Sequence, residues 1–435
     1  MIRALTNATL YDFDHYVENA FVKFDTVIRE TGPMAAFDST GCEAIDVHGA
    51  VVMPGLVLAH THVYSTFVRG LSLPFAPKRF QDILDQLWWR LDRCLDLPAT
   101  ALSGAVAAAE YLQNGVTAIV DHHAGGAIEG SLAVLAKAMV TEAGMKAAFC
   151  FETSDRFDIA ACIRENLAFR DLAEPGRTAA LFGLHASMSL SDATLAQVAA
   201  QAAGLPIHVH AAESCDDEDA CWRDHAERVV FRFDRYGLVT PGSLFVHCVH
   251  CDDAELELLA QKGAVIAVNP TSNMNNGVGL PDVRKMQEKG IRVVLGDDGI
   301  SASAASELRA LYFAMRHRYG SPTAFSLGDL KKIMDDTYLF LSDLLQAKLG
   351  RIRPGYAADL VVLPYAAPTP IDPENAFGHF FFGMLPGFRP QHVFAGGHPA
   401  VMDYRIDPDL AAKAAGTQRE ARALWDRIAK EGIQR

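Results

Sequence analysis

Short apolar segments alternate with amphipathic ones along most of this chain. Eight runs rich in Val, Ile, Leu and Ala lie near residues 56–60, 116–121, 146–152, 180–184, 206–210, 243–247, 264–269 and 292–297. Between them, residues 191–203 and 252–262 have helical spacing, with a capping Ser or Asp at the start and a glycine just after the end. Buried strands that alternate with helices are typical of a parallel sheet, and eight such strands close a TIM barrel. The pattern predicts an α/β fold with a (β/α)8 barrel over residues 56–354.

The two ends of the chain have a different pattern. Residues 2–5, 16–23 and 27–30 are short β-type segments with turn residues between them, and residues 360–363 and 393–395 return to that pattern. We expect these segments to pair in a small β-sandwich domain built from both chain ends, residues 1–55 and 355–410. Residues 411–435 are predicted to form a C-terminal helix.

Composition and charge narrow the class of protein. The chain has 435 residues, half of them hydrophobic, a formal net charge of -14 and no block of Lys or Arg, which argues against nucleic-acid binding. No apolar run reaches the ~18 residues that a membrane span needs. The N-terminus has no apolar stretch behind a basic start, so we expect no signal peptide and a cytoplasmic protein.

Eight cysteines are spread along the chain. In a cytosolic protein they are expected to be reduced and buried. A structural zinc site built from Cys215, Cys221, Cys248 and Cys251 is the alternative, but the spacing between these pairs does not fit the usual zinc templates.

Histidines and carboxylates stand at the ends of four predicted strands. They are His60 and His62, His208 and His210 followed by Glu213, His247 and His250, and Asp297 and Asp298. The carboxyl ends of barrel strands meet at one face, where barrel enzymes carry their chemistry. Residues i and i+2 of a strand point the same way, so both imidazoles of the first pair can face one ion. We expect His208 to pack away from that face. Three imidazoles and one carboxylate suit zinc or Fe(II).

Six segments that contain these residues resemble the amidohydrolase superfamily, in its cytosine deaminase and chlorohydrolase branch. They are PGLVLAHTH (54–62), HVHAAE (208–213), HCVH (247–250), NPTSNMNNGVG (269–279), LGDDG (295–299) and RPGYAADLVVL (353–363). They run in the order of that family and span nearly the whole chain. The segments LWWRLDR (87–93), DHHAG (121–125) and FETSDR (151–156) resemble one group of aminohydrolases within the branch.

The resemblance implies roles for individual residues. His60, His62, His210 and Asp298 match the ligands of one divalent metal ion, zinc first and iron second, that activates water. Asp298 would also accept a proton from that water. Glu213 matches the glutamate that shuttles protons. His247 matches a histidine that orients or polarises the bound water and substrate, and His185 matches one that contacts substrate. The residues after His185 are Ala-Ser-Met, where relatives often have a proline and an aromatic residue, so that wall of the pocket is expected to differ.

Three further residues are candidates for substrate contact. Trp88 could stack on a flat heterocycle, although its helix could instead pack in a subunit interface. Arg69 could reach a substrate oxygen or form a structural ion pair. Either His122 or His123 can face the cavity, but not both, because neighbouring strand residues alternate.

The predicted function is hydrolytic deamination of a small nitrogen heterocycle, such as a purine, pyrimidine or pterin, by a homodimer or larger homo-oligomer. Cleavage of an amide, an imine or a carbon–chlorine bond is the alternative within enzymes. A non-catalytic scaffold is the alternative outside them, although such proteins usually lose their metal ligands.

Overall fold

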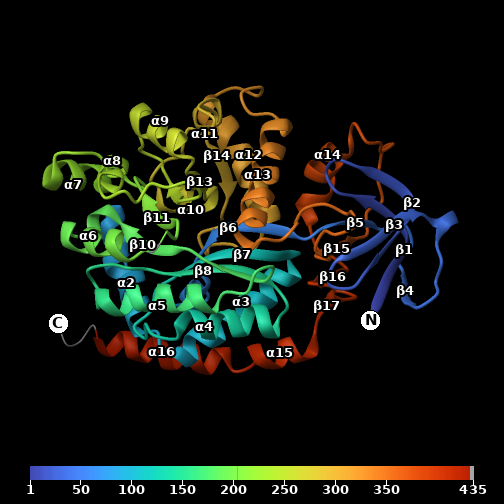
Figure 1. Cartoon of the computed structure of the whole chain (residues 1–435), viewed down its shortest axis with the longest axis horizontal. Helices are drawn as coiled ribbons and strands as arrows, with labels where there is room; N and C mark the ends of the chain where they lie inside the picture. The colour runs from blue at the N-terminus through green and yellow to red at the C-terminus, as the bar shows by residue number, and fades with distance from the viewer. Residues whose placement is uncertain (203, 432–435) are drawn as a thin grey trace.

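Two parallel sheets form the larger part of the molecule in the computed structural model, which describes residues 1–202 and 204–431 (Figure 1). One sheet has the strand order β6 (Leu56–Thr61), β7 (Val116–His123), β8 (Lys146–Phe151) and β9 (Thr178–Ala180). The other has the order β10 (Phe182–Ala186), β11 (Ile207–Ala211), β12 (Leu244–His247), β13 (Val265–Val268) and β14 (Arg292–Leu295). Each of the eight predicted runs overlaps one of these strands, and β9 is an additional short strand.

Hydrogen bonds join the two sheets at both edges. At one edge Thr153 N donates to Gly183 O at 3.0 Å, and His185 N donates to Thr153 O at 3.1 Å. At the other edge Asp297 N donates to His60 O at 2.9 Å. The strands therefore form a mixed α/β body in which the carboxyl ends of β6 and β14 lie side by side.

Helices connect the strands and begin and end where the sequence indicates. The cap of α9 has Asp252 Oδ1 accepting from Glu255 N at 2.9 Å, and Gly263 ends the helix at φ 69°. The predicted helix from residue 191 is α6, and its predicted end at Ala203 lies outside the described residues. The connecting helices are α3 (Leu97–Gln113), α4 (Ser131–Ala136), α5 (Ile159–Leu172), α6 (Asp192–Gln201), α7 (Cys215–His225), α8 (Val229–Arg235), α9 (Asp253–Lys262), α10 (Pro270–Asn276), α11 (Val283–Glu288), α12 (Ala304–Tyr319) and α13 (Leu327–Leu345).

A long insertion follows β6 and lies over the carboxyl ends of the strands. It contains η2 (Val63–Val68), α1 (Phe80–Ile83), the π-helical turn η3 (Leu84–Trp88), α2 (Trp89–Leu91) and η4 (Asp92–Cys94). Several of its side chains line the cavity described below.

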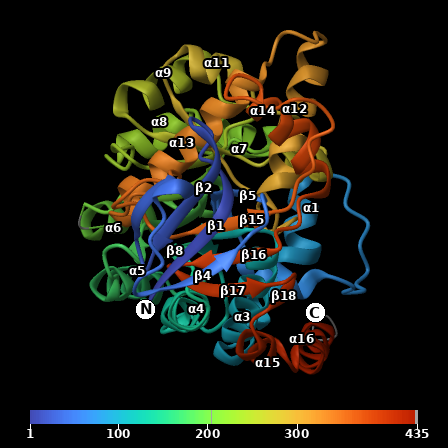
Figure 2. The ribbon, with the colours of Figure 1, turned by 90° about the vertical axis from the view of Figure 1, so that its right-hand side faces the viewer.

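Strands from both ends of the chain form a third, nine-stranded sheet. Its order is β18 (Arg405–Ile406), β17 (His398–Met402), β16 (His392–Ala395), β15 (Leu360–Leu363), β5 (Val51–Pro54), β1 (Ile2–Tyr11), β2 (Tyr16–Phe24) and β3 (Ile28–Pro33), and β4 (Cys42–Asp46) also pairs with β1. The join is antiparallel, with Leu360 opposite Pro54 and Leu363 opposite Val51. Figure 2 shows the late strands beside the early ones. The apolar faces of these strands pack in a core of their own.

The end of the described chain packs on the insertion. After the short α14 (Ala376–Gly378), α15 (Pro408–Ala414) and α16 (Thr417–Glu431) run along the lower side of the body in Figure 1. Trp425 Nε1 donates to Phe67 O at 2.8 Å, and Arg427 Nε donates to Cys94 O at 3.2 Å. The predicted helix 411–435 thus corresponds to parts of two helices, and residues 432–435 lie outside the described part.

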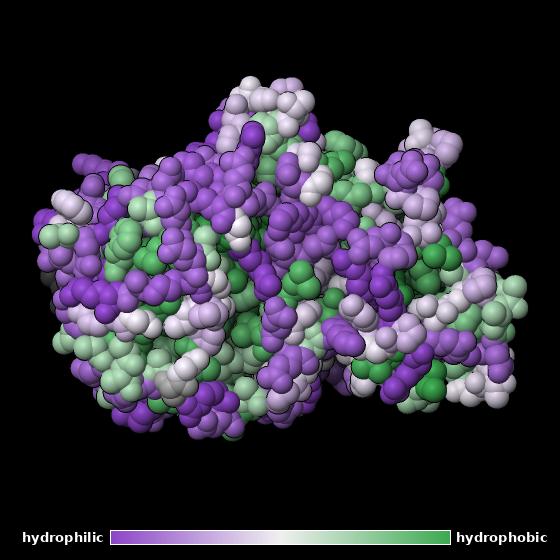
Figure 3. Space-filling view, turned by 45° about the horizontal axis from the view of Figure 1, so that its top comes forward, coloured by the Kyte–Doolittle hydropathy of each residue, from purple (hydrophilic) through white to green (hydrophobic). Residues whose placement is uncertain are grey.

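Within the described chain, no helix is both long enough and apolar enough to cross a bilayer. Hydrophilic residues cover much of the face in Figure 3, with hydrophobic ones between them.

Candidate active site

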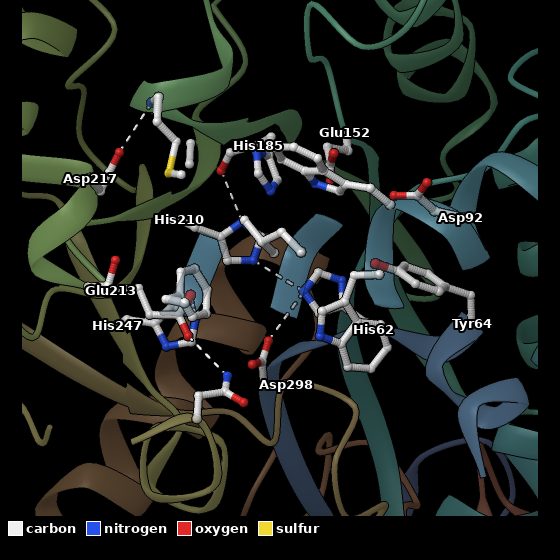
Figure 4. Close-up of a pocket in the computed structure, with 18 residues that line it drawn as sticks. His62, Tyr64, Asp92, Glu152, His185, His210, Glu213, Asp217, His247 and Asp298 are labelled. Atoms are coloured by element: carbon white, nitrogen blue, oxygen red, sulfur yellow. Dashed lines mark hydrogen bonds and ion pairs between the residues drawn. The ribbon is translucent and has the colours of Figure 1, made fainter. Parts of the chain in front are cut away.

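Side chains from the ends of four strands converge at one cavity (Figure 4). His60 lies in β6 and His62 directly after it, His210 lies in β11, His247 ends β12 and Asp298 follows β14. His60 Nε2 and His62 Nε2 lie 2.9 Å and 3.2 Å from Asp298 Oδ1, and His62 Nε2 lies 3.2 Å from His210 Nε2. The four residues predicted as metal ligands therefore meet at one point.

The outer nitrogens of two imidazoles are fixed by backbone carbonyls. His62 Nδ1 lies 2.7 Å from His122 O, and His210 Nδ1 lies 2.9 Å from His185 O. A carbonyl only accepts, so both Nδ1 atoms carry protons and the lone pairs of neutral His62 and His210 lie on Nε2. Two lone pairs facing each other at 3.2 Å, beside the carboxylate of Asp298, need a positive charge between them. A proton or a divalent cation supplies it, so the residues fit a metal ion.

His247 has the opposite tautomer. Its Nδ1 accepts a hydrogen bond from Asn273 Nδ2 at 2.9 Å and lies 3.5 Å from Asn269 Nδ2. The proton of the neutral ring is therefore on Nε2, which lies 3.5 Å from Glu213 Oε2. Asn276 Nδ2 donates to Glu213 Oε1 at 3.3 Å. His247 thus presents a donor to the cavity, where His62 and His210 present lone pairs.

Two of the site residues have left-handed backbone. Asp298 has φ 54° and His247 has φ 71°, a region that non-glycine residues rarely adopt. These conformations occur where the strands end, and they accompany side chains that turn back toward the cavity. Ser272 Oγ donates to Asp298 Oδ2 at 2.5 Å and fixes the carboxylate, while Oδ1 faces the histidines.

Burial and the carboxylate of Asp298, which His60 and His62 share, determine the charges of these side chains. Burial alone would lower the pKa of His62, but the hydrogen bond and the charge of Asp298 raise it to about 9. Burial would raise the pKa of Asp298, yet the hydrogen bonds of His60 and His62 hold it well below its usual range. Burial lowers the pKa of His60 to about 4. Without a metal ion, the positive charge of the cluster is thus the proton on His62.

Glu213 is buried beside this cluster. Burial and the charge of Asp298 raise the pKa of Glu213 well above its ordinary value. A neutral carboxylic acid at this position can donate a proton to a molecule bound next to the histidines.

The structure corrects the expected position of His208. Residues 208 and 210 lie on the same face of β11, because side chains in a strand repeat every two residues. His208 is fully buried and its Nε2 lies 2.8 Å from His60 Nδ1, while its Nδ1 lies 3.4 Å from Cys150 Sγ. It therefore supports His60 from below the site and does not pack on the outer side of the strand.

Three groups of side chains among the described residues are close enough together to hold a metal ion. Ligand atoms of His60, His210, His247 and Asp298 lie within 4.8 Å of one another, and so do those of His62, His122 and His210. The third group, Glu218, Cys251 and Glu255, already has a cation, because Arg228 Nε lies 2.7 Å from Glu255 and Arg228 Nη2 lies 3.3 Å from Glu218.

The eight cysteines are all free thiols, and the predicted alternative of a four-cysteine zinc site is absent from the metal-binding groups found among the described residues.

The cavity is narrow and joins a larger outer chamber. Its free volume is about 60 Å³, whereas small-molecule sites typically have ~300–1,000 Å³. The outer chamber has about 750 Å³, and Phe80, Trp88, Ser214 and Asn276 line both. The insertion, through Phe80 and Trp88, thus supplies part of the boundary between the outer chamber and the cavity at the histidines.

The four residues predicted to contact substrate occupy different surroundings. His185 lines the inner cavity, with Nδ1 2.6 Å from Ser189 Oγ, and Trp88 separates the two chambers. His122 is fully buried, and its Nε2 lies 3.0 Å from Leu184 O. Its ring packs against the metal-site histidines from behind.

Arg69 lies at the outer chamber and not at the inner one. Its side chain is 61% exposed, and its Nη2 lies 2.5 Å from Glu110 Oε2. The structure thus places it in an ion pair, the alternative that the sequence left open.

Sequence reasoning missed several residues of the cavity. Glu152 and Asp92 line it, and Asn273 and Ser272 orient His247 and Asp298. Glu152 directly follows β8, so the rule that selected the other strand ends could have found it. Asp92 lies deep in the insertion, where no sequence pattern indicates its position.

Comparison with known proteins shows the family of the chain and its fold. Residues 51–400 match the sequence profile of the amidohydrolase family. The chain is 29% identical over 417 residues to a 5-methylthioadenosine/S-adenosylhomocysteine deaminase of Natronomonas pharaonis, covering 92% of this chain and 93% of the relative. It is 27% identical over 375 residues to a 5'-deoxyadenosine deaminase of Methanopyrus kandleri, covering 82% of each. A zinc-bound adenosine deaminase from Xanthomonas campestris has the same fold, with a TM-score of 0.82, 21% identity and 98% of each chain covered. The profile match extends over most of the chain, which therefore belongs to the amidohydrolase family.

Proposed function

We propose that this chain is a metal-dependent hydrolytic deaminase that replaces an amino group on a nitrogen heterocycle by oxygen. The observation that carries the proposal is the meeting of three histidines and one aspartate beside the buried side chain of Glu213. The similarity to purine nucleoside deaminases supports a purine-type substrate.

His60, His62, His210 and Asp298 are proposed to hold one divalent ion, zinc first and iron second. By distance alone, His247 is an alternative ligand for the ion. Its tautomer argues against that role, because Nε2 carries a proton and has no lone pair for an ion. When bound, the ion would polarise a water molecule and lower its pKa toward ~7.

The side chains then have distinct tasks. Asp298 takes a proton from the attacking water, whose oxygen bonds to the substrate carbon. Glu213 gives its proton to the neighbouring ring nitrogen. Its carboxylate then takes the proton left on the added oxygen and passes it to the amine as the carbon–nitrogen bond breaks and ammonia leaves, and the proton held by Asp298 returns to Glu213. His247 Nε2 donates to the oxygen as negative charge develops on it. General acid–base steps of this kind contribute ~100- to 10,000-fold each.

We also propose that β6–β8 and β10–β14 close into a (β/α)8 barrel over residues 56–354. The hydrogen bonds between Thr153 and Gly183 and between Asp297 and His60 support closure. Residues 1–55 and 355–410 would form the small β-domain, and residues 411–435 the C-terminal helix. Assembly into a homo-oligomer and location in the cytoplasm stay predictions.

An ammonia-release screen with defined metal loading tests the function. We expect release from at least one member of a panel of purines, purine nucleosides, pyrimidines, pterins and triazines. Glu213→Gln should retain its metal and lose about 100- to 10,000-fold in turnover. Chloride release from a chlorotriazine without ammonia release would favour the carbon–chlorine alternative, and no product with a fully loaded metal site would favour a scaffold.

A further inference from the structure

A charged cluster lies on the wall of the cavity away from Glu213. It consists of Asp92, which begins η4, Glu152, which follows β8, and Arg156. Arg156 Nη2 lies 2.9 Å from Asp92 Oδ2 and 2.6 Å from Glu152 Oε1, and Arg156 Nη1 lies 3.3 Å from Asp92 Oδ1. In Figure 4, Glu152 and Asp92 lie on the upper right side and Glu213 on the left. Neither carboxylate has a part in the chemistry proposed above.

One carboxylate oxygen of this cluster is left without a donor. Both oxygens of Asp92 and one oxygen of Glu152 accept from Arg156, and none of the hydrogen bonds found among the described residues reaches Glu152 Oε2. Glu152 is only 3% exposed, and it lines the cavity. Glu152 Oε2 is not among the fully buried atoms that lack a partner, so this oxygen is open to the cavity, where a donor of a bound molecule can reach it.

The cluster also has an excess negative charge. Two carboxylates share one guanidinium, which leaves about one negative charge at this wall. The Arg156 guanidinium also lies 4.7 Å from the centre of the Trp89 ring and 4.7 Å from the centre of the Phe157 ring. Nearby charges hold the pKa of Glu152 down at about 2 although burial alone would raise it, so this carboxylate is ionised.

We infer that Glu152 Oε2 accepts a hydrogen bond from a hydroxyl or amino group of the substrate, remote from the carbon that is attacked, and that the cluster excludes anionic groups from this wall. Glu152 is thus a specificity-determining residue. The inference rests on the proposed function, because it assigns a protein contact to the part of the same substrate that lies away from the reacting carbon. It predicts a neutral substrate that carries a second hydrogen-bond donor.

Direct binding of matched compounds to the metal-loaded protein tests the inference. Adenosine is compared with 2',3'-dideoxyadenosine, which lacks two hydroxyls, and 2,6-diaminopurine is compared with adenine, which lacks one amino group. Adenosine 5'-monophosphate keeps the hydroxyls and adds a phosphate. We expect the donor-bearing member of at least one pair to bind about 10- to 100-fold more tightly, as for hydrogen bonds to charged groups. We expect the monophosphate to bind more weakly than adenosine.

In the variant Glu152→Gln, the ratio of affinities between the donor-bearing compound and its partner should fall at least tenfold. The ratio of affinities between adenosine and its monophosphate should fall at least tenfold as well. Glu129→Gln is the matched control, because Glu129 also pairs with an arginine, Arg164 at 2.7 Å, but on the surface. Thermal unfolding of both variants checks that they fold.

Failure of the inference and failure of the proposed function are distinguishable. An unchanged preference in Glu152→Gln, equal binding of adenosine and its monophosphate, or no binding of any probe overturns the inference. Ammonia release without any donor preference overturns it and leaves the proposed function standing. Preferential binding that depends on Glu152, with no ammonia release from any compound, supports the inference and counts against deamination.

Discussion

Replacement of His208 by phenylalanine tests how the metal site is supported. An ion on His60 Nε2 requires the proton of that ring to be on Nδ1, and His208 Nε2, at 2.8 Å, is its acceptor. The variant leaves the Nδ1–H of a fully buried ring without an acceptor, although phenylalanine fills similar space.

The size of the effect follows from this contact. Loss of the partner that orients a metal-bound histidine typically costs 10- to 100-fold in metal affinity, or about 1.4–2.8 kcal/mol. The cost of an unpaired buried donor, about 1–3 kcal/mol, is in the same range. We therefore expect His208→Phe to bind zinc about 10- to 100-fold more weakly than the wild type.

Competition with a chromophoric chelator measures this affinity, and thermal unfolding of the metal-free proteins separates it from misfolding. His392→Phe is the control, because His392 is also buried but lies in the nine-stranded sheet. A folded His208→Phe protein with wild-type zinc affinity would refute the supporting role of His208.

Three other predictions concern charge, surface and packing. The raised pKa of His62, about 9, means that the stabilisation of metal-free protein by its proton is complete below pH ~6.5 and lost as the pH rises through about 9. Zinc displaces this proton, so zinc affinity measured by calorimetry should rise with pH across that window, and a flat profile would contradict the assignment. Arg69→Ala removes an exposed ion pair with Glu110, so it should change the free energy of unfolding by no more than ~1 kcal/mol and leave the zinc affinity unchanged. A large loss of zinc affinity would show that Arg69 does more than form this ion pair. Gly296→Ala would place a methyl group against Asn269 Oδ1 and 2.8 Å from His60 O, so it should lower the melting temperature and the zinc affinity together. Wild-type values for both would show that Asn269 and β6 can move away without disturbing the site.

The fold was largely predictable from the chain because each strand is a short apolar run between helices. The late segment 360–363 was predicted with the bounds that β15 has in the structure. Its neighbour across the sheet, β5, lies more than 300 residues away, and only the shared β-type pattern of the two chain ends indicated the pairing. Sequence spacing could not show that β9 adds a short strand or that residues 408–431 form two helices.

Most residues of the candidate site were predictable because they, too, follow the strand pattern. His60, His210, His247 and Asp298 lie at or just beyond strand ends, and the carboxyl ends of parallel strands meet at one face. The direction assigned to His208 was wrong because the two-residue repeat of a strand was not applied to it. Asp92 and Trp88 depend on the conformation of the insertion, which long-range packing determines and no local pattern records.

One divalent ion, held by His60, His62, His210 and Asp298, is proposed to be required for hydrolysis. The direct measurement titrates zinc into metal-stripped protein and records bound metal and ammonia release together, with the most reactive compound of the screen. We predict that release rises in proportion to bound zinc and saturates at about one ion per chain, and that Asp298→Asn neither binds zinc tightly nor releases ammonia. Full ammonia release from metal-stripped protein, or saturation only at two ions per chain, would contradict the account.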